Sequence, residues 1–85
     1  MSYAVQVSSH AGRSLAKAPV AVQSAIRPAL VGLAADSRPP GCQKLQGRPG
    51  WRIRVGRWRI IYAIDDPAQT VTILEIGPRP DVYRP

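Results

Sequence analysis

The sequence has few of the residues that build disulfides, metal sites and acidic surfaces. Its 85 residues include one cysteine, Cys42, one histidine, His10, and five acidic side chains. A single cysteine excludes an intrachain disulfide, and Cys42 and His10 stand too far from other ligand-type residues to suggest a metal cluster. We therefore expect no metal and no cofactor. A free thiol and a surface histidine are the simpler interpretations of these two residues.

Long apolar runs and a secretion signal are also missing. No segment reaches the ~20 consecutive apolar residues that a membrane-spanning helix needs, and no basic amphipathic helix is evident. Residues 1–7 lack the basic-then-apolar order of a signal peptide. These absences predict a cytoplasmic protein without a membrane partner. A chain of this length, 45% hydrophobic, is expected to form a single domain over residues 1–85.

Positive charge, in contrast, is abundant. Twelve Lys and Arg residues against five Asp and Glu give a net charge of +7 and a pI near 10.8. All but two of these cations, Lys17 and Lys44, are arginines. The planar guanidinium group recognises phosphate with two parallel hydrogen bonds, so this composition favours a nucleic-acid partner over a merely solubilising surface.

The first half of the chain has helical character. Capping residues and apolar spacing predict a strand at 3–7, a helix capped by Ser8 or Ser9 that ends near Lys17, and a second helix from Pro19 to Ala35. Pro28 lies inside the second helix, where proline removes a backbone hydrogen bond, and predicts a bend. The breaker-rich segment 36–41 ends this helical half.

The second half has the composition of a sheet. Segments 51–55, 58–65 and 70–76 are rich in β-branched and aromatic residues and are separated by short turns. They predict a three-stranded antiparallel meander. Helices followed by strands indicate an α+β fold with the helices packed on one face of the sheet.

A two-residue turn at Gly56-Arg57, with glycine in the first position of a type II′ turn, would determine the register of the first hairpin. The expected facing pairs are Val55 with Trp58, Arg54 with Arg59, Ile53 with Ile60, Arg52 with Ile61, and Trp51 with Tyr62. Alternate pairs point to opposite faces, so one face is apolar or aromatic and forms the core. The other face carries three arginines.

Those three arginines indicate an anionic ligand. Arg54 and Arg59 are expected to oppose each other directly, and like charges in that position destabilise a hairpin. The segment 44–59 contains six cations and no acid. An RNA backbone bound to this face would offset the repulsion. The alternative is a basic face that is simply solvated.

Four stretches of the chain resemble the RelE/ParE superfamily of toxins: Lys-Leu-Gln-Gly at 44–47, Trp-Arg-Ile-Arg-Val-Gly at 51–56, Trp-Arg-Ile-Ile-Tyr at 58–62 and Asp-Val-Tyr-Arg at 81–84. The helical hairpin, the Arg-Pro-Pro-Gly loop at 38–41 and the Ile-Gly-x-Arg-x-Asp-Val-Tyr pattern at 76–83 also match, so the resemblance covers nearly the whole chain. It implies the toxin of a type II toxin-antitoxin system with the RelE-like fold.

The superfamily has two branches with different activities. RelE-like members cut messenger RNA in the ribosomal A site, whereas ParE-like members poison DNA gyrase. The positions that surround the scissile phosphate in RelE-like enzymes are matched by Arg52, Arg54, Arg59, Arg79 and Tyr83. Further RNA contacts are expected from Lys44, Arg48, Arg57 and Arg84. This retention favours the nuclease branch. Inhibition of gyrase by protein binding, or a catalytically inactive basic binding module, are the alternatives.

The implied reaction is attack of the RNA 2′-hydroxyl on the neighbouring phosphate, which leaves a cyclic phosphate and a free 5′-hydroxyl without a metal. Arg54, Arg59 and Arg79 would stabilise the developing negative charge. Arg52 stands where the family can use lysine as a proton acceptor, yet a guanidinium stays protonated in proteins. Tyr83 becomes the hypothetical base if the guanidinium groups stabilise its phenolate.

The sequence also departs from the family pattern. Pro78 stands where relatives often carry His or Lys, which removes a possible proton donor, and Pro80 is a second departure. Among the acids, Asp65 and Asp66 fit the chemistry of a turn, and Asp81 fits a role in orienting Arg79 or Arg84. Glu75 is the one acid whose side chain can reach a sheet face, and a catalytic role for it is a minor alternative.

The resemblance also implies partners. A cognate antitoxin would cover the basic surface with an acidic or amphipathic segment. The ribosome and its A-site message would be the targets, and operator DNA would be bound only through the antitoxin complex.

Overall fold

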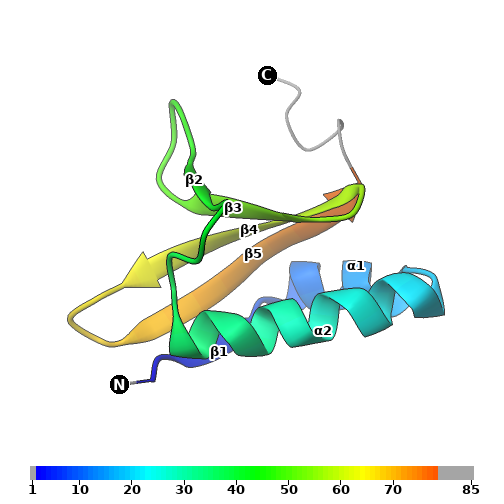
Figure 1. Ribbon diagram of the computed structural model, residues 1–85, viewed down its shortest axis with the longest axis horizontal. Helices are drawn as coiled ribbons and strands as arrows, with labels where there is room; N and C mark the ends of the chain where they lie inside the picture. Colours follow the sequence, from blue (N-terminus) through cyan, green and yellow to red (C-terminus); the bar gives the residue numbers. More distant parts are fainter. Residues whose placement is uncertain (1, 79–85) are drawn as a thin grey trace.

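The chain folds as two layers, helices on one side and a sheet on the other, in a computed structural model that describes residues 2–78 (Figure 1). The elements in chain order are β1 (Ala4–Val7), α1 (Ser9–Lys17), α2 (Val20–Ala35), β2 (Gln43–Lys44), β3 (Trp51–Val55), β4 (Trp58–Asp65) and β5 (Thr70–Pro78). The five strands form one mixed sheet in the order β1-β5-β4-β3-β2. The predicted α+β class and the antiparallel meander of β3, β4 and β5 are confirmed.

Both helices begin and end close to where the sequence predicts. Ser8 is the N-cap of α1, and its hydroxyl accepts a hydrogen bond from the N–H of Ala11 at 3.1 Å. α2 follows Pro19 and continues through Pro28 without interruption. Pro28 is exposed, so its ring meets solvent on the outer side of the helix.

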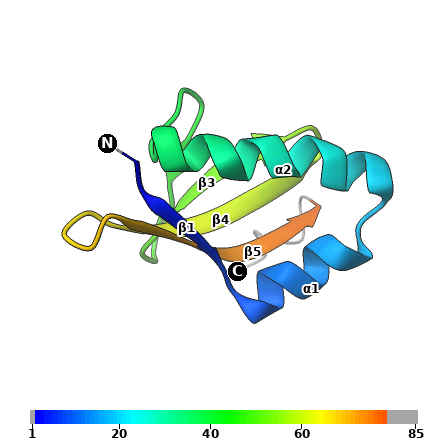
Figure 2. The same cartoon turned by 90° about the horizontal axis from the view of Figure 1, so that it is seen from below.

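The helices cover one face of the sheet, and the core lies between the two layers (Figures 1 and 2). α2 contributes Ile26, Leu30 and Leu33, which are all buried. From the predicted apolar face of the sheet, three side chains are buried in the same cluster and three pack against it: Ile53, Ile60, Tyr62, Trp51, Val55 and Trp58. The sequence prediction of the core face is confirmed.

The register of the first hairpin is also as predicted. The five facing pairs of β3 and β4, from Val55 with Trp58 to Trp51 with Tyr62, are those expected from a two-residue turn. Gly56 has a φ of 62°, and Arg57 is not among the residues with positive φ. A positive φ at the first position alone is the signature of a type II′ turn. This turn therefore fixes which side chains of β3 and β4 face away from the core.

Two strand pairings were not predicted. β2 pairs antiparallel with β3 at Gln43 and Lys44, and β1 pairs parallel with β5. The β2 pairing places Gln43 beside Arg52, on the edge of the sheet that borders the loop after α2. β1 closes the opposite edge.

A β-bulge interrupts the pairing of β4 with β5. Ile61 faces Glu75 and Tyr62 faces Ile73, so Leu74 is one extra residue on β5. The hydroxyl of Ser8 donates a hydrogen bond to the carbonyl oxygen of Leu74 at 3.2 Å. The N-cap of α1 thus also supplies a partner for the backbone of the bulge.

Candidate nucleic-acid interface

The face of the sheet turned away from the helices carries the three predicted arginines. Side chains on this face form two rows across β3, β4 and β5: Arg54, Arg59 and Gly77 in one, and Arg52, Ile61 and Glu75 in the other. Neighbouring strands lie about 4.8 Å apart, so each row is roughly 10 Å wide between the outer backbones. We call these two rows the cationic face.

The three arginines differ in exposure. Arg54 is exposed and Arg52 is half-buried, whereas the side chain of Arg59 is 0% exposed. Arg59 therefore occupies the predicted register position without presenting its guanidinium to solvent. A charge in a low-dielectric environment acts on nearby anions more strongly than an exposed one, although burying it costs free energy that neighbouring groups must offset. Arg54 and Arg52 are the two that a ligand can reach directly.

Two hollows adjoin Arg52. The first, of about 310 Å³, lies between β3 and the loop after α2, and its lining is Pro40, Gly41, Gln43, Arg52, Ile53 and Arg54. The second, of about 330 Å³, lies beneath the loop between β2 and β3, and its lining is Gln43, Lys44, Leu45, Gln46, Arg48 and Arg52. Arg52 donates a hydrogen bond to Oε1 of Gln43, so this pair forms the wall between them. Among the described residues, both linings contain cations and neither contains an acid.

The loop between β2 and β3 reaches across the cationic face. Figure 1 shows this loop rising from the sheet on the side away from the helices. Nη2 of Arg48 lies 3.1 Å from Oε2 of Glu75, and the two side chains are 45% and 33% exposed. Since Arg48 precedes β3 and Glu75 is on β5, this ion pair links the loop with a strand two positions away in the sheet.

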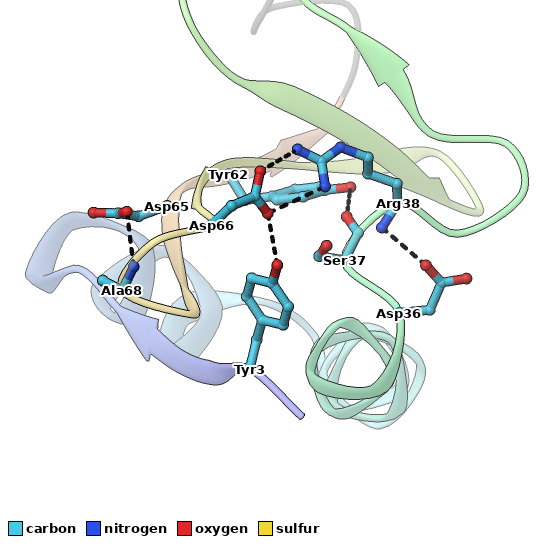
Figure 3. A network of polar contacts seen from close by, with 8 residues as sticks. All are labelled: Tyr3, Asp36, Ser37, Arg38, Tyr62, Asp65, Asp66 and Ala68. Carbon is cyan, nitrogen blue, oxygen red and sulfur yellow. Dashed lines mark hydrogen bonds and ion pairs between the residues drawn. The ribbon is translucent and has the colours of Figure 1, made fainter. Parts of the chain in front are cut away.

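A polar network fixes the loop after α2, which forms one wall of the first hollow (Figure 3). Nη2 of Arg38 lies 3.0 Å from Oδ2 of Asp66, and the hydroxyl of Tyr3 donates to Oδ1 of the same carboxylate at 2.6 Å. The guanidinium of Arg38 also lies 5.1 Å from the ring centroid of Trp51, close enough for a cation–π interaction. The bonds from Arg38 and Tyr3 lower the pKa of Asp66, and the bond to Asp66 raises the pKa of Tyr3.

A buried hydroxyl group also anchors the loop after α2. The hydroxyl of Tyr62 donates to the carbonyl oxygen of Ser37 at 2.9 Å, and both residues are buried. Burial raises the pKa of Tyr62, and the neighbouring Cys42 adds to the shift. Tyr62 is therefore a neutral structural donor at physiological pH. Cys42 is half-buried beside it and packs against the core cluster.

The two aspartates of the turn between β4 and β5 have separate roles. Oδ1 of Asp65 accepts a hydrogen bond from the N–H of Ala68 at 3.1 Å, which confirms the predicted turn chemistry. Asp66 instead uses its carboxylate for Arg38 and Tyr3, so its prediction as a turn residue missed its main contacts. Proximity in sequence gave no indication of these partners.

The other predicted RNA-binding residues divide into three groups. Lys44 and Arg48 are exposed and share the second hollow with Arg52. Arg57 is exposed at the turn between β3 and β4, where it borders a hollow against α2 rather than the two described above. Lying outside the described residues are Arg79, Asp81, Tyr83 and Arg84.

Two features are absent from the described residues. Over residues 2–78, no group of three or more His, Cys, Asp or Glu side chains is arranged to hold a metal ion. Within the same part of the chain, no helix has both the length and the apolar character needed to cross a membrane. His10 is exposed on α1, on the helical side of the molecule.

The fold and its basic sheet face define a RelE/ParE-type toxin, and the comparisons with known proteins agree. A family model described as "ParE toxin of type II toxin-antitoxin system, parDE" matches residues 7–83. The chain therefore belongs to the ParE toxin family of type II toxin-antitoxin systems. No curated protein matches the sequence at a significant level.

Solved structures with this fold come from bacteria and archaea. The RelBE2 toxin-antitoxin complex of Mycobacterium tuberculosis contains a chain 27% identical, with a TM-score of 0.83 over 93% of this chain and 100% of that one. The RelE–RelB complex of Pyrococcus horikoshii contains a chain that is 25% identical, with a TM-score of 0.82 over 93% of this chain and 97% of that one. The Escherichia coli RelBE complex, at 21% identity and a TM-score of 0.79 over 92% of this chain and 98% of that one, is similar in fold.

The names in these comparisons point to both branches of the superfamily. The family model carries the ParE name, and the solved structures carry the RelE name. Membership thus defines a type II toxin without distinguishing RelE from ParE activity.

Proposed function

We propose that this toxin inhibits translation by cutting messenger RNA in the ribosomal A site. The observation that carries the proposal is the pair Arg52 and Arg54. They alternate with Ile53 on β3, so both point away from the core while Ile53 anchors the strand in it. The hollow that they line with Gln43 offers a phosphodiester several hydrogen-bond donors at once.

Such a site would act by positioning and by charge. When the RNA 2′-oxygen attacks the neighbouring phosphate, negative charge builds up on the phosphate oxygens. Guanidinium donors already aimed at that position stabilise this charge without further rearrangement. Arg52 and Arg54 would contact the phosphate directly, and the buried charge of Arg59 would act from beneath it. Arg79 and Tyr83, outside the described residues, are proposed to complete the site.

The second hollow supports a longer RNA-binding track. Lys44 and Arg48 line it together with Arg52, which borders both hollows. Contacts of this kind read the phosphate backbone and carry no base sequence. We therefore assign the choice of the cleaved position to the ribosome, which holds the message in a defined frame. Arg57 and Arg84 are proposed as outlying phosphate contacts.

The natural inhibitor is proposed to be a cognate antitoxin. The M. tuberculosis and P. horikoshii relatives were solved as complexes with their antitoxins. A segment with acidic side chains would compete with RNA for the cationic face, because the chain carries a net charge of +7. Operator DNA would be bound through the antitoxin complex alone.

The second candidate function is inhibition of DNA gyrase by protein binding, which the match to the ParE family model favours. The outer side of α2 offers a surface for it, since Val20 and Val31 are 78% and 72% exposed. A supercoiling assay with purified gyrase distinguishes the two: a nuclease of the proposed kind leaves supercoiling unaffected.

The exchange Arg54→Ala tests the proposed function in a cell-free translation reaction. Loss of one preorganised donor slows comparable reactions by about 100-fold to 1000-fold, and we expect a loss of that size in message cleavage. Arg13→Ala is the matched control, because Arg13 is also exposed but lies on α1. Equal cleavage by the wild type and Arg54→Ala would contradict the assignment of the site.

A further inference from the structure

Glu75 is the one acid that the described residues place on the cationic face. It shares a row with Arg52 and Ile61, on the outer strand of the three. The other acids of residues 2–78 lie elsewhere: Asp36 follows α2, and Asp65 and Asp66 lie at the turn between β4 and β5. A carboxylate within a surface built from arginines is unexpected if the surface only attracts anions.

The bulge in β5 is what directs Glu75 to this face. Ile73 and Ile76 are both buried in the core although they are three residues apart, an odd spacing that a regular strand would not allow. The extra residue Leu74 restores the alternation, so that Glu75 faces Ile61 and points away from the helices. Bulges often occur beside active sites, where they redirect a side chain in this way.

The surroundings leave the carboxylate within reach of a ligand. Ile61, between Arg52 and Glu75 in the row, is 1% exposed, so neighbouring groups cover it. The side chain of Glu75 remains 33% exposed. A phosphodiester held by Arg52 would thus lie on one side of the covered Ile61, with Glu75 on the other side, across a row roughly 10 Å wide between the outer backbones.

The proposed reaction requires a proton acceptor that the arginines cannot supply. The attacking 2′-hydroxyl must lose its proton, and a guanidinium stays protonated in proteins. A carboxylate is a common general base. Tyr83, the base hypothesised from the sequence, lies outside the described residues, and among the described residues position and chemistry both point to Glu75.

We propose that Glu75 is the general base of this toxin and that Arg48 holds it in the free protein until a substrate phosphate takes Arg48. The inference rests on the proposed nuclease function. Glu75 accepts the proton of the 2′-hydroxyl as the 2′-oxygen bonds to phosphorus and the bond from phosphorus to the 5′-oxygen breaks. The leaving oxygen takes a proton from water, and Glu75 returns its own proton to solvent.

Arg48 is suited to move from Glu75 to a substrate phosphate because it has two sets of partners. Its guanidinium binds Glu75 in the free protein, and its side chain also lines the hollow that holds Lys44 and Arg52. An exposed ion pair of this kind contributes little to stability, so an incoming phosphate can displace it readily. Binding of RNA would then free the carboxylate at the point where the base is required.

The test is single-turnover cleavage of messenger RNA on purified ribosomes, which separates affinity from the rate of the chemical step. Glu75→Gln keeps the shape of the side chain but removes the base. We expect the maximal rate to fall about 100-fold or more, a typical contribution of a general base. Affinity for the ribosomal complex should stay equal or rise, since a negative charge is lost from a surface that binds phosphates. Glu75→Asp should restore part of the rate.

Arg48→Ala distinguishes a base from a mere anchor of the loop. If Glu75 acts only by holding the loop through Arg48, both substitutions remove the same contact and must lower the maximal rate equally. If Glu75 is the base, Arg48→Ala mainly weakens affinity and lowers the maximal rate far less than Glu75→Gln does. Unfolding midpoints of all variants serve as the control for folding.

The outcomes keep the two proposals apart. Cleavage by the wild type and an equal maximal rate for Glu75→Gln would overturn the role of Glu75 and leave the nuclease function intact. Failure of the wild type to cut any message would overturn both.

Discussion

At the scale of single residues, Asp66 shows how much of this site depends on contacts between distant segments. Its carboxylate joins Tyr3, from the start of the chain, to Arg38, from the loop after α2. Arg38 in turn lies over the ring of Trp51 at the start of β3. Asp66 therefore helps to hold the wall of the first hollow through Tyr3 and Arg38, which are not among the residues that line it.

The ionisation of Asp66 should make stability depend on pH. Its pKa in the folded protein is lowered below the ordinary value of 3.8, mainly by the bond from Arg38. The ionised form therefore stabilises the fold at neutral pH, and this contribution is lost as the pH falls through the lowered pKa. We predict that Asp66→Asn unfolds at a lower temperature than the wild type at neutral pH, and that the difference narrows as the pH falls below 3.8. Thermal unfolding followed by circular dichroism at neutral and at acidic pH checks this, and a difference of constant size would contradict it.

The positions of the site arginines could be predicted from the sequence, but their exposure could not. The turn at Gly56 determines the register, and the register places Arg54 opposite Arg59. Whether a side chain on that face is covered depends on packing of segments far apart in the chain, which local patterns do not encode. Arg59 is fully buried, whereas its neighbour Arg54 is exposed.

At the scale of secondary-structure elements, helices and long strands could be predicted because apolar spacing and capping residues are local signals. β2 was missed because two residues, Gln43 and Lys44, are too few to show alternation. The parallel pairing of β1 with β5 is long-range and has no local signal. The bulge at Leu74 was missed because Ile73, Leu74 and Ile76 fit several registers equally well from sequence alone.

Two glycines, one in the turn between β3 and β4 and one in α2, provide a matched test of how backbone conformation affects stability. A Cβ at Gly56 or at Gly32 would meet no atom within 4 Å, so neither substitution causes a clash. Gly56 has a φ of 62° in the type II′ turn, and we predict that Gly56→Ala destabilises the fold by about 1 to 2 kcal/mol. Gly32 is exposed in α2, where alanine is the better helix former, so Gly32→Ala should stabilise by about 0.5 to 1 kcal/mol. Urea unfolding measures both, and changes of the same sign would contradict the account of the turn.

At the scale of the whole molecule, the two-layer fold separates stability from function. The helices and the inner face of the sheet enclose the apolar core, and the outer face carries Arg52 and Arg54 although Ile61 and Arg59 are buried there. That face concentrates positive charge beside two hollows. The proposed site and the apolar core thus lie on opposite faces of one sheet.

The central claim is that this face cuts messenger RNA held by the ribosome. The most direct measurement is primer extension on a defined message in a purified translation system, with and without ribosomes, followed by analysis of the RNA ends. The account predicts cuts only when ribosomes are present, with a cyclic phosphate on one fragment and a 5′-hydroxyl on the other. Intact messages on translating ribosomes, together with inhibition of gyrase supercoiling by the same preparation, would contradict it.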